Sequence, residues 1–440
     1  MSDRAASRFS GQNVAVFFAC FAIPAILFVA HLSQGADTLI ASAWACLAAA
    51  LALALVLLLH PFERLPASIL LLTLLLGGTV AGGLTGNWYQ ARAEIVQLAA
   101  GLAFWSAGIL LAQSRRLLGL CWTSLIAGIA LFGVLALISY PLSATGYTDG
   151  SDTSAITRLS FSFGSPNVMA SLMGVGAILS AVHITYLLRT RVASDIPRLA
   201  KISQMPRSGY ISALALLICA SCLLLSLSRA AITLTLGVLA VWLTIEIGLR
   251  ARQSDSGDAP RRRRRPLIML AVAAASVLLI LLTLSSGQIG ARSGALGTDS
   301  MGRWEIFSEY WAAWQEHPLF GFGLGSFNRV NESITTLDNA WRLVTMGAAH
   351  NILLQWLIQT GIVGTAIMVS VWLWMHGKII RVAATQSNNS IHYIAIAALL
   401  VSVFLILHNL VDFSLEIPSI MWTYAFLLGL ACGTSIRKRA

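Results

Sequence analysis

The sequence predicts an all-α polytopic membrane protein with about 12 transmembrane helices and one large extramembrane loop that contains helices. Two observations indicate this class. Hydrophobic residues make up 57% of the 440 residues and charged residues only 11%, whereas a soluble domain carries about 25% charged residues. The apolar runs are about 17 to 25 residues long, the length that a helix needs to cross a bilayer, and they do not alternate as the strands of a membrane barrel do.

Twelve apolar runs follow one another along the chain. The first of them lacks a small-x-small cleavage site, so we expect a first span rather than a removed signal peptide. The chain then divides into residues 1–285 with spans one to nine, a loop over 286–350, and residues 351–440 with the last three spans and a tail. The runs lie near 13–31, 38–59, 66–84, 96–112, 118–140, 164–189, 209–227, 230–248, 267–285, 351–375, 392–408 and 417–435.

The distribution of Lys and Arg predicts the orientation of these spans. If the N-terminus is cytoplasmic, the segments on the outer side hold seven of the 29 Lys and Arg residues, all of them Arg. Because short cytoplasmic loops retain the cations, both termini are predicted to be cytoplasmic and the 286–350 loop external. The run Arg261–Arg265 is then an anchor facing anionic lipid, which explains the net charge of +11 without nucleic acid. The seven outer arginines are Arg92, Arg158, Arg229, Arg292, Arg303, Arg329 and Arg342.

The six cysteines all fall inside apolar runs, and no spacing among them suggests a metal site. We interpret them as small buried hydrophobic residues. The sequence therefore predicts no metal centre.

The sequence of the 286–350 loop predicts a helix over 303–316, because five aromatic residues recur there near helical spacing. Such aromatic side chains suit the boundary between water and lipid, or they could cover a sugar. Pro318 ends the helix, and a Gly-rich turn follows at 321–326, which is not a dinucleotide motif because it follows no strand. A second polar stretch covers about 328–345. The aromatic residues are Trp304, Phe307, Tyr310, Trp311 and Trp314.

Two of the outer arginines are candidates for binding an anion. Arg229 stands between two apolar runs with almost no loop between them. A cation near hydrocarbon is costly unless it is paired, and with no acidic neighbour in sequence a phosphate is a suitable partner. The alternative is a side chain that extends to water. Arg303 opens the aromatic helix, and its alternative is a solvated pair with Glu305 or Glu309. Arg292 and Arg158 are weaker candidates, and we interpret Arg329 and Arg342 as surface residues.

Several residues at the outer ends of the last three spans could take part in proton transfer. His350 lies where the loop enters the span at 351–375, and an imidazole with a pKa near ~6.5 suits the removal of a proton from a hydroxyl. A structural role at the helix start is the alternative. His408 and Asp412 lie at the outer end of the next two spans. Asp412 could orient a base or an acceptor sugar, or could be a helix-end charge in water.

Taken in their order along the chain, these candidate residues and the segments around them resemble the O-antigen ligase and polymerase superfamily of bacterial inner membranes. The resemblance covers roughly residues 150–425. Its strength lies in the order, spacing and topology of the motifs together. They are Phe163–Asn167, Ser228–Ala231, Gly302–Trp304 with 314–325, His350–Asn351 with 361–364, and His408–Pro418.

The resemblance implies a metal-independent, inverting glycosyl transfer on the periplasmic face of the inner membrane, with no cofactor. The donor would be a glycan on undecaprenyl pyrophosphate, with Arg229 and Arg303 holding the pyrophosphate and His350 activating the acceptor hydroxyl. The acceptor would be lipid A-core or a lipid-linked glycan. The further residues that could bind or orient the acceptor are Asp412, His408, Asn351 and Asn167.

Three functions within this superfamily stay open for the chain, together with one function of another class. We favour a ligase that moves O-antigen onto lipid A-core. An O-antigen or exopolysaccharide polymerase shares the donor residues, and a protein O-glycosyltransferase usually carries a larger outer C-terminal part. A lipid or polysaccharide transporter predicts polar residues buried at mid-membrane, whereas here the ionisable residues cluster at span ends, with His183 as the main exception.

Overall fold

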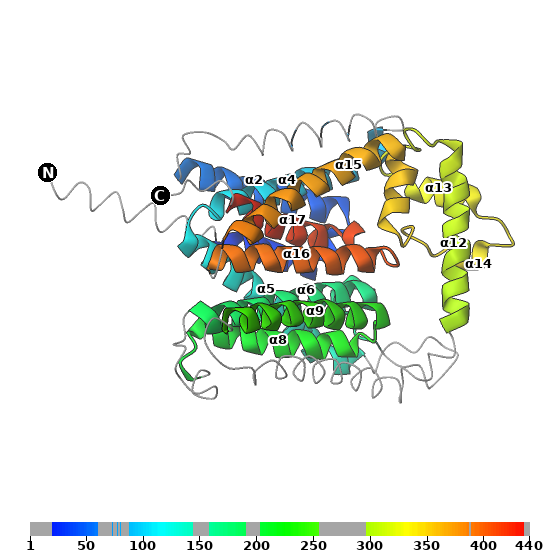
Figure 1. Cartoon of the computed structure of the whole chain (residues 1–440). Helices are drawn as coiled ribbons and strands as arrows, with labels where there is room; N and C mark the ends of the chain where they lie inside the picture. The colour runs from blue at the N-terminus through cyan, green and yellow to red at the C-terminus, as the bar shows by residue number, and fades with distance from the viewer. Residues whose placement is uncertain are drawn as a thin grey trace.

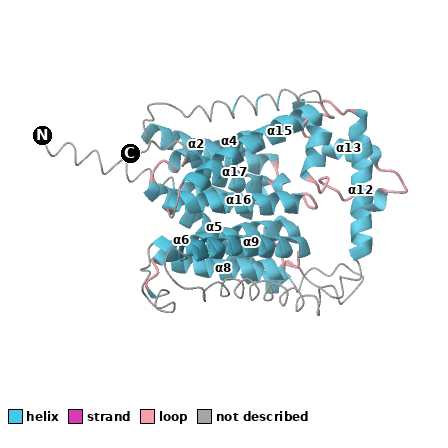
Figure 2. Ribbon diagram, viewed as in Figure 1, coloured by secondary structure: helices cyan, strands magenta, loops and turns pink. Residues whose placement is uncertain are grey.

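The computed structural model describes residues 20–59, 88–143, 158–190, 203–254, 296–386 and 389–434, and three single positions between 73 and 80. Within these ranges the regular structure is helical throughout (Figure 2). Seven of the described helices are long and apolar enough to cross a membrane, and three shorter apolar helices lie at Cys20–Leu32, Leu39–Leu51 and Pro418–Gly433. The predicted spans at 66–84 and 267–285 lie outside the described residues, so the number twelve stays a prediction.

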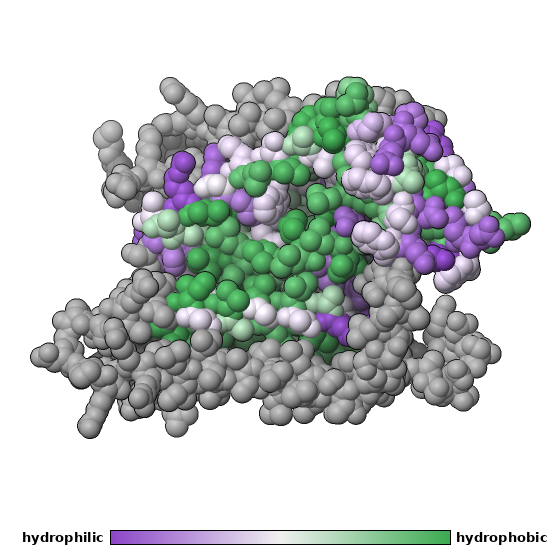
Figure 3. Space-filling view, turned by 45° about the vertical axis from the view of Figure 1, so that its right-hand side comes forward, coloured by the Kyte–Doolittle hydropathy of each residue, from purple (hydrophilic) through white to green (hydrophobic). Residues whose placement is uncertain are grey.

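The long helices lie side by side in one bundle, and α12, α13 and α14 lie together beyond one end of it (Figure 1). We call this the loop end of the bundle. Figure 3 shows hydrophobic residues over the side of the bundle and hydrophilic residues gathered at the loop end. The elements are η1 (Gln34–Ala36), α2 (Leu39–Leu59), α4 (Trp88–Leu111), α5 (Arg115–Ser143), η2 (Phe161–Phe163), α6 (Pro166–Thr190), α8 (Arg207–Leu225), α9 (Arg229–Ser254), α12 (Leu296–Glu316), α13 (Phe327–Ile334), α14 (Ala340–Leu343), α15 (Ile352–Thr385), α16 (Ser390–Asn409), η4 (Ser414–Glu416) and α17 (Pro418–Gly433).

Helix α6 is the centre of the bundle, because it packs on α5, α8, α9 and α16. Of the candidate spans it is the most enclosed, with 83% of its apolar stretch buried inside the protein. Bilayer hydrocarbon is as apolar as these side chains, so close packing rather than exclusion from water holds the helices together. The first residues of α6, which include Asn167, therefore have fixed positions at the loop end.

Helices α4 and α17 pack at backbone distance. A Cβ atom added to Gly429 would lie 2.1 Å from the carbonyl oxygen of Trp105, and one added to Gly433 would lie 2.4 Å from that of Ile109. The two glycines are four residues apart, the small-residue spacing that lets membrane helices approach closely. Trp422 Nε1 also donates a hydrogen bond to the Gln97 carbonyl at 3.0 Å. This contact fixes α17, and with it η4 just before it.

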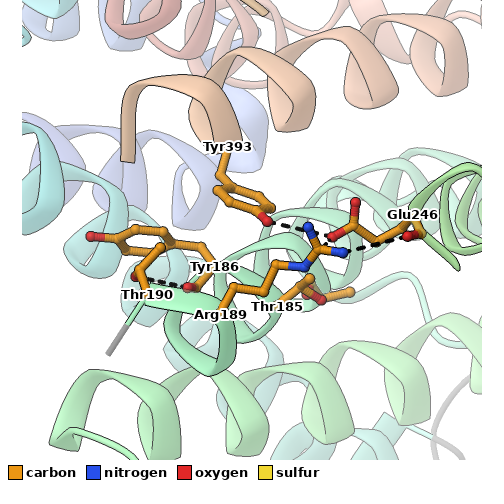
Figure 4. A network of polar contacts seen from close by, with 7 residues as sticks. Thr185, Tyr186, Arg189, Thr190, Glu246 and Tyr393 are labelled. Atoms are coloured by element: carbon orange, nitrogen blue, oxygen red, sulfur yellow. Dashed lines mark hydrogen bonds and ion pairs between the residues drawn. The ribbon is translucent and has the colours of Figure 1, made fainter. Parts of the chain in front are cut away.

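An ion pair joins three helices near the end of the bundle opposite to the loop end (Figure 4). Arg189 of α6 approaches Glu246 of α9, with 2.7 Å between Nε and Oε1. Tyr393 of α16 donates a hydrogen bond to the same oxygen at 3.4 Å. The Arg189 and Glu246 side chains are only 17% and 9% exposed, so loss of one partner would leave a buried charge, a change that costs about 3–5 kcal/mol in other proteins.

Helices α12, α13 and α14, which we call the loop piece, share a small hydrophobic core with the first turns of α15. Tyr310 is fully buried and donates a hydrogen bond to Asn331 Oδ1 at 2.7 Å, and Asn331 Nδ2 donates to the Leu343 carbonyl at 2.9 Å. Arg342 forms an ion pair with Glu305. The predicted helix at 303–316 is present and begins earlier, at Leu296. Of its aromatic residues, Tyr310 packs inside this core, so the aromatic spacing reflects packing as well as surface chemistry.

Candidate functional site

The Gly-rich turn attaches the loop piece to α15 through backbone hydrogen bonds. Phe322 N–H donates to the Ile358 carbonyl at 2.8 Å and Gly323 N–H to the Gln359 carbonyl at 3.0 Å. In return, Ile362 N–H donates to Pro318 at 2.9 Å and Val363 N–H to Leu319 at 3.1 Å. These bonds form where α15 is broken at Gly361, whose φ is 62° and ψ −167°. The break in α15 thus supplies the donors and acceptors that hold the loop piece.

The same turn reaches α4. Gly325 N–H donates to Gln359 Oε1 at 2.7 Å. A Cβ atom on Gly325 would lie 2.2 Å from the carbonyl oxygen of Gln90, in the first turn of α4. The turn is therefore clamped between α15 and α4, which fixes α12 over the first turns of α15.

A cleft of about 580 Å³ lies between α12 and α15. One wall carries Trp304, Phe307 and Trp311, and the other carries leucines of the first two turns of α15. Asn351 also lines the cleft. Arg303 directly precedes Trp304 and His350 directly precedes Asn351, so the cleft joins the two chain segments that carry these predicted residues. The side chain of Arg303 lies outside the described atoms.

The His350 backbone is held in a left-handed conformation with φ 53°. Asn351 next to it caps α15, because its side chain accepts hydrogen bonds from the N–H groups of Leu353 and Leu354. Asn351 Nδ2 donates to the Leu410 carbonyl at 3.1 Å, and the His350 ring lies edge-on to Phe413 with 4.6 Å between centroids. A non-glycine residue in this conformation persists only where the surroundings hold it. Asn351 thus fixes His350 against the turn that follows α16.

That turn is itself built from buried polar side chains. His408 Nδ1 lies 2.8 Å from Ser171 Oγ of α6. Asn409 Oδ1 accepts a hydrogen bond from Leu415 N–H at 2.7 Å. Asp412 is 1% exposed and accepts from Phe413 N–H at 2.8 Å. The alternative of a helix-end charge in water is therefore wrong for Asp412, and His408 joins α16 to α6 inside the bundle.

The predicted residues at the start of α6 and at the start of α9 also come together. Arg158 donates from Nε to the Ser226 carbonyl at 2.9 Å and from Nη2 to Asn167 Oδ1 at 3.0 Å. Ser226 stands three residues before Arg229, and Leu227 between them has a positive φ of 51°. Arg158 thus fixes the junction from which Arg229 starts α9.

Contacts through α6 connect this junction with the His350 side. Asn167 binds Arg158, and Ser171, one helical turn later, binds His408. Phe413, which touches His350, follows in the same turn as His408. The structure therefore brings together at the loop end the segments that carry Arg229, Asn167, His408, Asp412, Asn351 and His350.

Sequence reasoning gave Arg158 too little weight and did not identify Ser171 or Phe413. The available signal for Arg158 was an outer cation nine residues before Asn167. The two arginines interpreted as surface residues have partners inside the loop piece, since Arg329 donates to the Phe322 carbonyl at 3.2 Å and Arg342 pairs with Glu305. In the part of the chain that the structure describes, no group of three or more His, Cys, Asp or Glu side chains could hold a metal ion.

Comparison with known families gives one match. The model of a family described as O-antigen ligase matches residues 214–369. The matched segment begins in α8 and ends in α15, and it contains Arg229, Arg303, His350 and the Gly-rich turn. A search of curated proteins finds no match.

Proposed function

We propose that this chain, whose residues 214–369 match the O-antigen ligase family, moves a glycan from undecaprenyl pyrophosphate to an acceptor hydroxyl. The reaction would take place at the loop end, on the periplasmic face of the bacterial inner membrane. The acceptor that we favour is lipid A-core. The family match alone supports a membrane glycosyltransferase of the ligase type. The donor and the acceptor are our proposal.

The observation that carries the proposal is the cleft between α12 and α15. It joins the turn of α12 that bears Arg303 to the start of α15 that bears His350. Its apolar wall suits the first isoprene units of the donor, since Trp304 is 75% and Trp311 48% exposed along it. An arginine and an imidazole on the two segments that border the cleft would suit a lipid diphosphate donor.

The chemistry follows from charge. Breaking the bond between sugar and phosphate builds negative charge on the departing pyrophosphate. Guanidinium groups in a poorly hydrated site stabilise that charge more than they stabilise the bound donor. Arg suits this role better than Lys, because its planar fork binds phosphate through two hydrogen bonds and keeps its charge. We assign this role to Arg229 and Arg303.

His350 would accept the proton of the acceptor hydroxyl as that oxygen attacks the sugar carbon from the face opposite the pyrophosphate. Its fixed backbone and the Phe413 contact would hold the ring in place. Asn351, His408 and Asn167 would support this geometry through the hydrogen bonds described above. Asp412 would orient the acceptor or the base from the same turn.

The test uses purified protein, a lipid-linked glycan donor, and either lipid A-core or a second lipid-linked glycan as acceptor. We expect glycan transfer, and a loss of roughly 10² to 10³-fold in His350→Ala, Arg229→Ala and Arg303→Ala. Arg92→Ala is the matched control, because Arg92 lies over the Tyr89 ring in the first turns of α4, and it should keep its rate within about twofold.

The outcomes separate the alternatives. Transfer to lipid A-core alone identifies a ligase, and transfer to the second lipid-linked glycan identifies a polymerase. A normal rate in any one of the three variants removes that residue from the site. Movement of the donor across a liposome membrane without bond cleavage would replace the enzyme with a transporter.

A further inference from the structure

A second cavity, of about 200 Å³, lies between α4, α15 and α17. It is on the other side of α15 from the cleft, because Ile352 lines this cavity while Leu353 and Leu354 line the cleft. Along α4 it extends from Glu94 to Trp105, which is about 17 Å at 1.5 Å per residue, or about half of the hydrocarbon depth of a membrane. Most of its wall is apolar, with leucines and methionines from all three helices. A cavity of this length and lining suits one hydrocarbon chain.

Two carboxyl groups line the cavity toward the loop end. Glu94 comes from α4, and Glu416 comes from η4 just before α17. Neither forms an ion pair with a Lys or Arg among the described residues, where the ion pairs are Arg189–Glu246 and Arg342–Glu305. Burial, together with the neighbouring Glu94 and Asp37 carboxyls, raises the pKa of Glu416 to about 8. The protein thus gathers acidic groups here without supplying a positive charge.

The wall of the cavity also contains a polar group without a partner. Trp105 is 2% exposed, lines the cavity, and its indole N–H has no hydrogen-bond partner among the described residues. An unsatisfied buried donor is unfavourable by about 1–3 kcal/mol. This N–H is enclosed by protein atoms about three helical turns from Glu94, so the unpaired carboxyls are the groups that a polar occupant would reach.

The charge of the cavity selects the occupant. Because the pKa of Glu416 is raised, the cavity without a ligand holds a protonated carboxyl group near neutral pH, and a lipid diphosphate would find no cation among the described residues here and would raise that pKa further. The donor of the proposed reaction therefore does not fit here. An ammonium group supplies the missing positive charge and donates hydrogen bonds to both carboxylates.

We propose that this cavity binds one phospholipid with an ammonium head group, of the phosphatidylethanolamine type, with an acyl chain along α15 and the ammonium at Glu94 and Glu416. The lipid fills the space between α4 and α15. It thereby supports the first turn of α15, which follows His350 and Asn351 directly. This inference concerns a different ligand and a different cavity from the proposed function, and it stands or fails separately.

The experiment measures which lipid stays bound to the full-length protein. The delipidated protein is reconstituted in bilayers of equal parts phosphatidylethanolamine and phosphatidylglycerol with the same acyl chains, then extracted for native mass spectrometry. We expect about ten times more ethanolamine lipid than glycerol lipid to stay bound. This is the ratio that one charge-assisted hydrogen bond would give. Glu94→Gln with Glu416→Gln should reduce that ratio to about one while a lipid is still retained.

Two further variants block the cavity. Gly101 lines it, and a Cβ atom there would lie 3.7 Å from Met421 Cε, so the backbone accepts a side chain that then fills the cavity. Gly101→Leu should lose at least about fivefold of the bound lipid, and Ala425→Leu, from the opposite wall, repeats the test if Gly101→Leu unfolds. Gly119→Leu on α5 is the control, since nothing lies within 4 Å of an added Cβ there.

Three results would overturn the proposal. One is equal retention of the two lipids by the wild-type protein. Another is unchanged retention in both Gly101→Leu and Ala425→Leu. The last is displacement of the ethanolamine lipid by added polyprenyl diphosphate, which would make the cavity part of the donor site instead.

Discussion

Replacing Gly361 by Ala should detach the loop piece from α15. Gly361 has φ 62° and ψ −167°, a region that essentially only glycine adopts, and forcing another residue into it costs about 1–3 kcal/mol. A Cβ atom there would also lie 2.3 Å from the carbonyl carbon and oxygen of Leu319. Both contacts are with backbone, so no side-chain rotation relieves them.

The magnitude follows from what the clash displaces. The four backbone hydrogen bonds between the 318–323 segment and α15 contribute about 1 kcal/mol each. The strain at residue 361 and the clash with Leu319 raise the energy of the closed junction alone, so local opening should become easier by about 3 kcal/mol, which is most of what these bonds contribute. An equilibrium shifts tenfold for each 1.4 kcal/mol, which predicts roughly a hundredfold increase in the open population.

Hydrogen–deuterium exchange of the purified protein measures this opening at the amides of Phe322, Gly323, Ile362 and Val363. They should exchange roughly a hundredfold faster in Gly361→Ala, while amides in α6 and α16 keep their rates. Gly321→Ala should behave in the same way, since its Cβ would lie 2.5 Å from the Ile358 carbonyl oxygen at φ 68°.

Gly377→Ala is the control within the same helix, because nothing lies within 4 Å of a Cβ atom there. Alanine favours a helix over glycine by up to about 1 kcal/mol, so protection should stay equal or rise. Unchanged exchange at Phe322 in Gly361→Ala would refute the view that the junction depends on a glycine-only backbone. Equal loosening by Gly377→Ala would assign the effect to α15 as a whole.

Three more predictions concern other parts of the chain. Glu246→Ala should lower the free energy of unfolding in detergent by about 3–5 kcal/mol, because Arg189 is left buried without its partner, and the double variant Arg189→Met with Glu246→Leu should recover most of the loss in a thermal melt. Stability should fall as the pH rises from about 5 to 8, by roughly 3–4 kcal/mol. The reason is that the pKa of Glu416 is raised from 4.5 to about 8 in the folded protein, which therefore holds that proton more tightly than the unfolded chain does. Glu416→Gln should flatten this slope, and a slope that stays the same would mean that Asp37 and Glu94 carry it. Arg158→Ala should slow glycan transfer roughly tenfold, through loss of the hydrogen bonds that position the residues before Arg229, and Arg158→Lys should not restore it, since one ammonium does not reproduce the two-sided reach of the guanidinium.

The sequence predicted most of the described spans, because each span consists of about twenty consecutive residues and needs no distant information. It also predicted the helix at 303–316, and the joint role of Asn167, Arg229 and His350 in one site stays a prediction. It did not predict the contact between 318–325 and the break in α15. The Gly-rich turn reads as an ordinary turn from its own residues, and only the backbone of Ile358 to Val363 shows why glycine is needed there.

Close approach of two helices is hidden from the sequence for the same reason. Gly429 and Gly433 have the spacing of a helix-packing motif, but neither residue indicates that the partner is α4, more than three hundred residues earlier. Arg158 is a related case. Its residue type and side of the membrane made it one of several outer arginines, and the hydrogen bonds to Ser226 and Asn167 distinguish it only once the chain is folded.

The strained residues of the described chain lie at the loop end, which supports a reaction site there. The non-glycine residues with positive φ are Gln34, Ala36, Phe161, Leu227 and His350. The first two belong to η1, which packs on the η2 turn that contains Phe161. Leu159, two residues before η2, donates a hydrogen bond to the Leu225 carbonyl, two residues before Leu227. Turns at the other end, such as 112–114 between α4 and α5, contain none among the described residues. Each such residue is unfavourable by about 1–3 kcal/mol and persists where its surroundings determine it, so the fold tolerates strain at the end where the candidate residues meet.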